Sequence, residues 1–316
     1  MISLIVPTRN RAHTLRLVAP SYFVQDGINE IIFVLDGGDD ETPQVLEQIA
    51  TSHPGVCTRI LQHDTRQGAA QSRNAGVQAS SNDFILFCDD DEYLEAGYAR
   101  TCLQKLLALG VGAVSGRRVY MENGEVPAQA LRRFGHGLRP GKAFRPVICE
   151  YVNGACFDGD IRQPLTNAVI LTHKHLLERF PYDPCYARGN GYREESDFQM
   201  HLYTEGYDLL TTNDCHSIHL PPALVRTGGQ RTQTARRIYW SIHYTHYFFG
   251  KYYAAYARRL GLGTPRWLAE VAFAIFAVYR ETLRPSLYAL AMWGLRQRRR
   301  WSERTVSASG HHGSPR

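Results

Sequence analysis

Short apolar runs alternate with amphipathic stretches along the N-terminal third of the chain. Four runs are rich in β-branched and aromatic residues and predict strands buried on both faces of a sheet: Ile2–Val6, Glu30–Leu35, Thr58–Gln62 and Phe84–Cys88. Three stretches between them have helical spacing: Ala12–Val24, Thr42–Ser52 and Gly68–Ala79. This alternation predicts an α/β fold, in which a mostly parallel sheet is wound with right-handed crossovers and flanked by helices.

The regular alternation ends near residue 111. Beyond it, the sequence predicts a strand at Gly112–Arg118, a loop in the Gly-, Pro- and Arg-rich segment Arg132–Pro146, and a strand at Thr166–Leu171. Two further helices are expected at His173–Arg179 and Glu195–Gly206, and the second ends on a glycine suited to a C-cap.

Aromatic residues and arginines dominate the C-terminal part of the chain, residues 226–316. Helical patterns cover an aromatic cluster from Tyr239 to Tyr253, an apolar stretch at Trp267–Tyr279, and a third at Leu287–Leu295 that runs into Arg296–Arg300. Aromatic residues with basic flanks are typical of helices that lie in a membrane interface. The same composition also suits a helical subdomain packed on the rest of the protein or on a second subunit. The polar end, Ser302–Arg316, is expected to fray.

Composition is that of a folded protein, because apolar residues make up 44% and charged residues 21% of the chain. The net charge of +6 suits anionic partners such as nucleotide phosphates or lipid headgroups, whereas no RNA-binding or zinc-finger pattern indicates nucleic acid. The seven cysteines form no CxxC pair, which favours free thiols in a reducing compartment. No signal peptide or spanning segment is evident, so the expected location is the cytoplasm, either free or peripheral at the cytoplasmic face of a membrane.

Polar clusters follow three of the predicted strands, where ligands bind on parallel sheets. The fourth strand runs directly into Asp89, Asp90, Asp91 and Glu92. Consecutive carboxylates repel one another unless a cation neutralises them, and oxygen ligands suit Mg²⁺ or Mn²⁺. On an extended chain Asp89 and Asp91 point the same way and Asp90 the opposite way, which offers one carboxylate to a metal and one to a ribose hydroxyl. A solvated acidic turn is the alternative.

Asp36 follows the second strand, and the glycines behind it let the backbone turn sharply. Its carboxylate could accept an N–H from a nucleobase. Alternatively it forms a local turn or caps the helix that begins near Thr42, a position for which Asp40 is better placed.

Four segments in order, VPTRNR, VLDGGDDET, RQGAAQSRNAG and ILFCDDDE, resemble the nucleotide-binding half of family-2 glycosyltransferases, which have the GT-A fold. The resemblance covers about residues 2–92. One departure is Leu35, which stands where the family usually has the first Asp of its VDD turn. The resemblance implies a nucleotide-binding half at residues 1–118 and an acceptor half at residues 119–225, which leaves residues 226–316 as the helical extension that their own pattern predicts.

The same resemblance implies roles for individual residues at the donor. Those expected to contact the nucleotide sugar are Pro7, Thr8, Arg9, Asp36, Arg73, Asp89 and Asp90. Asp89 and Asp91 correspond to the DxD motif, with Asp91 as the direct metal ligand. From the residues alone, Arg73 could equally be an exposed helix residue paired with Asp64.

A second acidic cluster, GNGYREESDF, is similar to the acidic motif that precedes a helix in the acceptor half of this family. Inverting transfer requires a general base to take the proton of the acceptor hydroxyl. Glu195 occupies that position by alignment, while Glu194 and Asp197 remain open as alternatives. An acidic helix N-terminus stabilised by the helix dipole would have the same composition.

Two later residues complete the expected site. His219 ends a predicted strand, where many GT-A enzymes have a histidine at the metal or diphosphate, although a structural role is equally compatible. Arg231 follows two glycines and could close over the donor phosphates.

The function expected from these features is metal-dependent transfer of a sugar, with inversion, from a UDP- or GDP-sugar to a glycan or lipid-linked acceptor. A nucleotidyltransferase acting on sugar phosphates would usually carry a Gly-rich loop and a lysine after the first strand, and VPTRNR has neither. A catalytically inactive nucleotide-sugar-binding module would be expected to lose its acidic motifs. The oligomeric state is not predicted.

Overall fold

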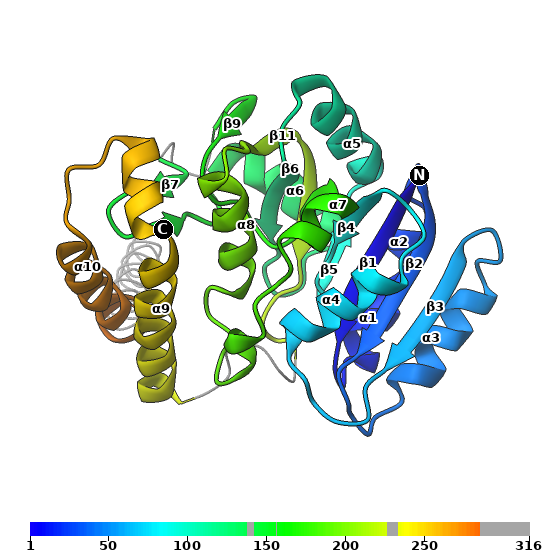
Figure 1. Cartoon of the computed structure of the whole chain (residues 1–316). Coiled ribbons are helices and arrows are strands. Elements are labelled where there is room, and N and C mark those ends of the chain that lie inside the picture. The colour runs from blue at the N-terminus through cyan, green and yellow to red at the C-terminus, as the bar shows by residue number, and fades with distance from the viewer. Residues whose placement is uncertain (138–141, 156, 226–232, 285–316) are drawn as a thin grey trace, which may run out of the picture.

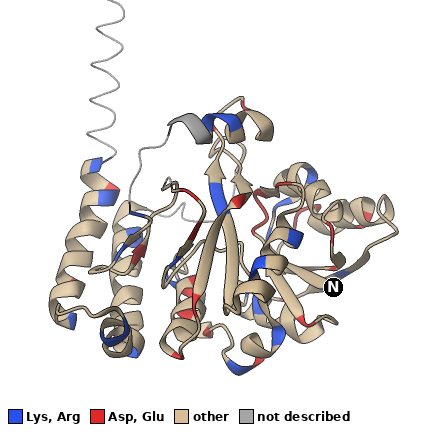
Figure 2. Ribbon diagram, turned by 90° about the horizontal axis from the view of Figure 1, so that it is seen from above, with Lys and Arg blue, Asp and Glu red and all other residues tan. Residues whose placement is uncertain are grey.

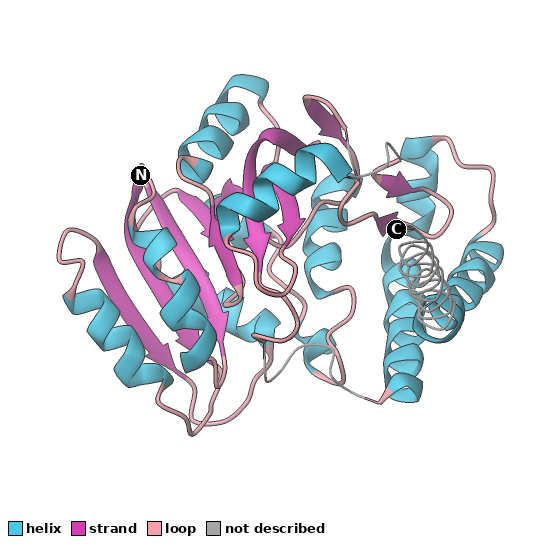
Figure 3. Ribbon diagram, turned by 180° about the vertical axis from the view of Figure 1, so that it is seen from behind, coloured by secondary structure: helices cyan, strands magenta, loops and turns pink. Residues whose placement is uncertain are grey.

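The computed structural model describes residues 1–137, 142–155, 157–225 and 233–284. Within these residues a nine-stranded mixed sheet runs through the molecule, with helices on both faces (Figures 1 and 3). The strand order is β3-β2-β1-β4-β10-β6-β11-β5, and β9 pairs with β11 off this path.

The N-terminal half has the predicted parallel arrangement. Its strands are β1 (Ile2–Thr8), β2 (Ile28–Leu35), β3 (Cys57–Gln62) and β4 (Phe84–Phe87), and its helices are α1 (Ala12–Val18), α2 (Pro20–Phe23), α3 (Thr42–Thr51) and α4 (Ala69–Ala79). Alternate residues of β1 enter two separate cores. Leu4 and Val6 face the core formed with α1 and α3, whereas Ile5 faces the core formed with α4. Burial on both faces explains the uninterrupted apolar run.

The second half continues the sheet with mixed strand directions. Its strands are β5 (Glu92–Leu94), β6 (Ala113–Tyr120), β9 (Asp160–Arg162), β10 (Leu171–His173) and β11 (Leu209–His219), and β7 (Phe144–Arg145) pairs with β8 (Glu150–Tyr151) in a separate hairpin. Its helices are α5 (Tyr98–Leu109), α6 (Pro127–Gly137), α7 (Lys174–Arg179), the 3-10 turn η1 (Pro184–Ala187) and α8 (Glu194–Thr204). Strand β10 is antiparallel to both β4 and β6, and β11 is parallel to β6.

Several predicted elements are wrong in detail. Strand β3 is not buried on both faces, because it lies at the sheet edge. Residues 132–137 belong to α6 rather than to a loop, since Ala130 and Phe134 lie one helical turn apart and bury together in the core. The helix predicted at Ala12–Val24 divides at Pro20, which begins α2.

The predicted strand Thr166–Leu171 is wrong except at its last residue, because β10 begins at Leu171. Two preceding amides donate to side chains instead of a neighbouring strand. Thr166 N donates to Gln199 Oε1 at 2.7 Å and Val169 N to Asn167 Oδ1 at 2.9 Å.

In its described residues, 233–284, the C-terminal extension is helical, as predicted. It consists of α9 (Thr234–Leu260), α10 (Arg266–Val278) and a π-helical turn, η2 (Tyr279–Leu283). The aromatic side chains Phe248, Phe249 and Tyr252 of α9 are buried in the same core as Phe198 of α8, so α9 packs directly on the α/β part. Among the described helices, none has the length and apolar composition needed to cross a membrane.

A buried ion pair joins α9 to α8. Lys251 Nζ donates to both oxygens of Asp197, at 2.7 and 2.8 Å, and to Asp183 Oδ2 at 2.8 Å. The hydroxyls of Tyr186 and Tyr252 also donate to Asp197, at 2.8 and 3.0 Å. Burial raises the pKa of Asp197 against the opposing effect of Lys251. The carboxylate therefore depends on its lysine and tyrosine partners.

Replacing Lys251 tests how strongly this link holds α9. The side chain of Asp197 is 2% exposed, so Lys251→Met leaves a buried carboxylate without its cation. We expect the free energy of unfolding to fall by about 3 kcal/mol in urea titrations, because breaking a buried pair leaves one charge uncompensated.

Lys105→Met is the matched control. Lys105 is about as exposed as Lys251, but its partners Asp160 and Asp214 are 29% and 58% exposed. We expect this variant to lose about 1 kcal/mol or less, since solvent screens the pair. Equal losses in the two variants would show that burial of Asp197 does not matter.

Candidate functional site

A cavity of about 530 Å³ lies at the carboxyl ends of β1 and β4 and is bounded on the other side by β8 and the N-terminus of α8. Its lining includes six carboxylates and four guanidinium groups: Asp89, Asp90, Asp91, Glu150, Glu194, Glu195, Arg11, Arg73, Arg118 and Arg193. Acidic groups exceed arginines among these residues, so the cavity is suited to a ligand that brings positive charge.

Arg73 of α4 is at the centre of the site and is only 3% exposed. Its guanidinium donates to Glu194, and lies 3.3 Å from Asp89 Oδ1 and 3.3 Å from Glu195 Oε1. One buried cation thus connects the end of β4 with the start of α8. The alternative prediction, an exposed Arg73 paired with Asp64, is wrong.

Arg118 of β6 is a second buried cation. Its Nη2 lies 3.0 Å from Asp89 Oδ2 and also pairs with Glu92, which is fully buried. Burial alone would raise the pKa of Asp89, but Arg118 and Arg73 outweigh that effect and hold the pKa below its ordinary value. For Glu92 burial prevails and raises the pKa to about 7. Asp89 was also expected to bind the metal, but its two carboxylate oxygens form ion pairs with Arg73 and Arg118 instead.

Asp90 faces Arg11, whose Nε lies 3.4 Å from Asp90 Oδ1. Burial raises the pKa of Asp90 to about 7. The neighbouring motif residues differ in position: Pro7 lines the cavity, whereas Thr8 is buried away from it and Arg9 is exposed to solvent. Of these three, the structure places only Pro7 in the cavity wall.

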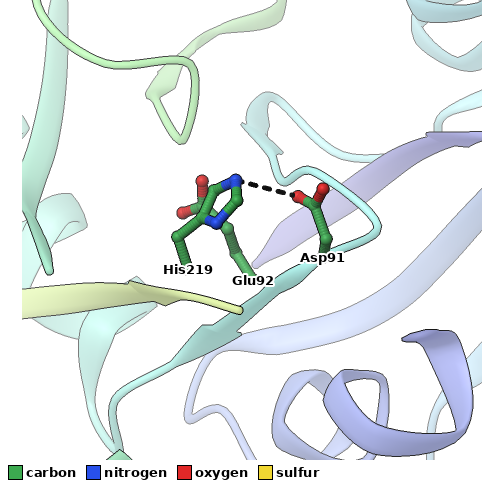
Figure 4. A group of neighbouring side chains, drawn as sticks. All are labelled: Asp91, Glu92 and His219. Atoms are coloured by element: carbon green, nitrogen blue, oxygen red, sulfur yellow. Dashed lines mark ion pairs between the residues drawn. The ribbon is translucent and has the colours of Figure 1, made fainter. Parts of the chain in front are cut away.

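Asp91 and His219 face each other across the cavity wall (Figure 4), with His219 Nε2 3.6 Å from Asp91 Oδ1. His219 Nδ1 lies 2.6 Å from the carbonyl oxygen of Leu220, which can only accept. Nδ1 must therefore carry a hydrogen, and Nε2, the ring atom left to bind a metal, faces Asp91.

Asp91, Glu92 and His219 bring one ligand atom each to within 4.8 Å of one another. They are the one group of this kind among the described residues. Carboxylate oxygen with one imidazole nitrogen fits a divalent cation, Mn²⁺ accepting such a mixed set more readily than Mg²⁺. Asp91 and His219 are 13% and 25% exposed, so both can reach an ion in the cavity.

Asp36 does not line the cavity. Its two carboxylate oxygens accept backbone N–H groups of Gln67, at 2.6 Å, and Gly68, at 2.9 Å. Asp36 thus fixes the turn that leads into α4. Asp36 does not cap α3 either: the N-cap position is Glu41, without a side-chain hydrogen bond, and Asp40 Oδ1, one residue earlier, accepts from Thr42 N at 3.0 Å.

The three candidate bases on α8 have different surroundings. Glu195 is 36% exposed and lines the cavity. Glu194 is 7% exposed against Arg73, and burial raises its pKa to about 8. Asp197 lies outside the cavity, enclosed by Lys251 and two tyrosines. Glu195 is therefore the acid of this group that an acceptor can approach. Arg231 lies outside the described residues.

Sequence reasoning missed several cavity residues. Arg118 ends a predicted strand and Arg11 belongs to the VPTRNR segment, so the rule that ligands bind at strand ends could have identified both. Glu150 comes from a hairpin that no sequence pattern distinguishes, whereas Tyr192 belongs to the GNGYREESDF segment, in which only the acidic residues were predicted to act.

The sequence matches known proteins over its N-terminal half. The family described as Glycosyl transferase family 2 matches residues 3–180. An uncharacterized glycosyltransferase of Haemophilus influenzae is 34% identical over 92 residues, which is 29% of this chain and 30% of that protein. The GalNAc(5)-diNAcBac-PP-undecaprenol beta-1,3-glucosyltransferase of Campylobacter jejuni is 32% identical over 105 residues, 33% of this chain and 34% of that protein. The match thus spans about a third of each relative's length.

Solved structures extend the similarity to most of the chain. A mannosyltransferase of Pyrobaculum calidifontis in complex with GDP-Man and Mn²⁺ superposes with a TM-score of 0.54 and 18% identity. The superposition covers 93% of this chain and 79% of that one. At this identity the similarity establishes the fold.

The buried Glu194 gives the stability of the protein a specific pH dependence. Its pKa of about 8 in the folded protein lies above the ordinary value of 4.5. Between these values the folded protein keeps a proton that the unfolded chain releases, so stability falls as pH rises, by up to about 1.4 kcal/mol per pH unit. We expect Glu194→Gln to lose less stability than the wild type between about pH 5 and pH 8 in urea unfolding. Parallel profiles for the two proteins would contradict this.

Proposed function

The chain belongs to glycosyl transferase family 2, and on this basis we propose that it transfers a sugar from a nucleoside diphosphate sugar to an acceptor hydroxyl. Its GT-A fold, expected from the sequence, agrees with the solved structures. The observation that carries the proposal is that one cavity holds both the Asp91–His219 pair and the accessible Glu195. Family membership sets aside the alternative of a nucleotidyltransferase.

In the proposed donor site, Asp91 and His219 hold Mg²⁺ or Mn²⁺, with Glu92 behind them. When bound, the ion would neutralise charge on the leaving diphosphate. Arg11 lies beside this group, with its Nη2 3.8 Å from Asp91 Oδ2, and can pair with a phosphate oxygen. Asp36 acts indirectly in this proposal, by fixing the turn before α4 that positions Arg73.

In the proposed acceptor site, Glu195 accepts the proton of the attacking hydroxyl. Arg73 restrains the Glu195 carboxylate from one side, at 3.3 Å, while the other side stays open to the cavity. A single displacement, in which the acceptor hydroxyl attacks the anomeric carbon opposite the leaving nucleoside diphosphate and Glu195 takes its proton, would invert the anomeric centre. The guanidinium of Arg73 also contacts Asp89, so the proposed acceptor and donor sites share Arg73.

The relatives suggest the classes of substrate. The Pyrobaculum structure contains GDP-Man and Mn²⁺, and the Campylobacter relative acts, by its name, on a saccharide linked to undecaprenol diphosphate. For this chain we propose a UDP- or GDP-sugar as donor and a glycan or lipid-linked saccharide as acceptor.

Nucleotide binding tests the donor site. We expect UDP or GDP at a hundredfold excess over Kd, with Mn²⁺, to raise the melting temperature by roughly 5 °C, because a ligand specific for the folded state stabilises it by mass action. Asp91→Asn should abolish the manganese-dependent part of the shift. Asp26→Asn, a surface acid paired with Arg100, is the control and should keep it. A shift that survives in Asp91→Asn would remove Asp91 from the metal site.

Glu195→Gln separates binding from transfer. We expect the variant to bind nucleotide like the wild type and to transfer about 10²–10⁴-fold more slowly, the usual contribution of a general base. Release of UDP or GDP from the donor, with a panel of simple glycosides as acceptors, measures the rate. Glu205→Gln, at the opposite end of α8, should be unaffected. Full activity in Glu195→Gln would assign the base elsewhere.

A further inference from the structure

One face of α10 and η2 exposes a continuous row of apolar side chains. The exposed members are Trp267, Leu268, Val271, Ile275, Val278, Tyr279 and Leu283, which we call the α10 face. Trp267 and Ile275 are 65% and 66% exposed, whereas Phe273, on the opposite side of the same helix, is 1% exposed and packs against Tyr192 and Arg193. An apolar row of this length is unusual on a protein that is solvated on all sides.

The acidic side chains of α10 and η2 are already paired. Glu270 accepts from Arg266 Nε at 2.7 Å, and Glu281 lies 2.9 Å from Arg237 and 3.0 Å from Arg280. Figure 2 shows charged residues gathered at the end of this helix where the grey trace begins. Arg284 is exposed at that end. The α10 face therefore presents apolar groups and cations.

A second apolar surface adjoins this face. A groove of about 500 Å³ at the β7–β8 hairpin is lined by five apolar residues and two cations: Phe144, Pro146, Val147, Ile148, Val152, Lys142 and Arg145. The guanidinium of Arg145 lies 4.9 Å from the ring centre of Phe276 on α10, so the groove and α10 are neighbours. The groove, like the α10 face, therefore combines apolar side chains with positively charged ones.

The sequence that follows has the same character. Residues 285–316 contain six arginines and one glutamate, and the apolar run Leu287–Leu295 leads directly into Arg296–Arg300. An apolar surface continued by a strongly basic segment is complementary to a bilayer with anionic headgroups, where each arginine contributes about 1 kcal/mol near the surface.

We propose that the α10 face lies on the surface of an anionic lipid bilayer, with its apolar side chains among the headgroups. The proposal concerns attachment to a bilayer and does not depend on the transfer reaction.

The α10 face is also connected to the cavity. Arg280 Nη1 of η2 lies 3.2 Å from Glu150 Oε1 and 3.1 Å from the hydroxyl of Tyr192, and both of these residues line the cavity. Tyr192 in turn contacts Phe273 of α10, with ring centres 5.8 Å apart. These contacts are made by the buried side of α10 and η2, so a bilayer on the α10 face would be separated from the wall that contains Glu150 by the thickness of this helix.

Co-sedimentation with vesicles tests the proposal without nucleotide, metal or acceptor, so its result is independent of the transfer assay. The full chain should pellet with phosphatidylcholine vesicles containing about a third phosphatidylglycerol, and not with phosphatidylcholine alone. Binding should weaken as salt is raised, because salt screens the attraction. Val271→Glu with Ile275→Glu should reduce the apparent binding constant at least about tenfold, since charged groups are costly in the interface.

Two further variants control for folding and for charge alone. Ile275→Ser changes the same face without adding charge and should weaken binding less. Leu107→Glu with Leu109→Glu adds the same two charges at leucines of α5 that are 58% and 41% exposed, and should not weaken it. Absence of binding to anionic vesicles by the wild type would overturn the proposal. Unchanged binding in the double variant would also overturn it, leaving residues 285–316 as the attachment. A wild-type dimer that becomes monomeric in the double variant, with no vesicle binding, would assign the α10 face to a second copy.

Discussion

The carboxyl edge of the sheet brings more carboxylates together than the neighbouring arginines can neutralise, and the rest of the site is arranged around that excess. Arg73 has the central part in this arrangement, because its buried guanidinium contacts Asp89, Glu194 and Glu195. It also lies over the ring of Tyr182, at 5.4 Å, which encloses it on a further side. Its position depends on α4, and the turn into α4 is fixed by Asp36 through two backbone amides. Asp36, which was expected to contact the nucleobase, thus helps to fix the position of the Arg73 guanidinium.

The helical extension holds the other side of the cavity in place. Arg193, which directly precedes Glu194, has a left-handed backbone with φ of 76° and a side chain that is 2% exposed. Its guanidinium lies 5.0 Å from the ring centre of Phe248 on α9 and 5.1 Å from that of Phe273 on α10. A left-handed conformation is costly for a residue other than glycine and persists only where its surroundings compensate. The packing of α9 and α10 therefore sets the direction in which Glu194 and Glu195 leave the start of α8.

Local sequence was sufficient to predict most helices and strands and the polar residues at the strand ends, because apolar runs and helical spacing can be recognised from residues close together in the chain. The parallel sheet, the acidic turn after β4 and the histidine at the end of β11 all follow from such patterns. The predictions that were wrong concern residues whose role depends on partners far away in the sequence. Asp197 and Glu195 are two residues apart on one helix, and only Lys251, far along the chain, makes the first a structural carboxylate. The buried segment before β10 likewise satisfies its amides with the side chains of Gln199 and Asn167, which strand propensity cannot anticipate.

The distribution of arginines indicates where a cation is needed. Asp89 contacts two guanidinium groups, Glu92 one and Asp90 one, whereas the nearest guanidinium nitrogen to Asp91 is 3.8 Å away. His219 Nδ1 donates toward the carbonyl oxygen of Leu220, so the ring atom of His219 available to a metal is Nε2, beside Asp91. Asp91 is thus the carboxylate of the β4 turn with the weakest compensation and a nitrogen ligand beside it. A divalent ion there would complete the neutralisation that the arginines begin, and it would do so next to Arg11, where an incoming phosphate finds a further positive charge.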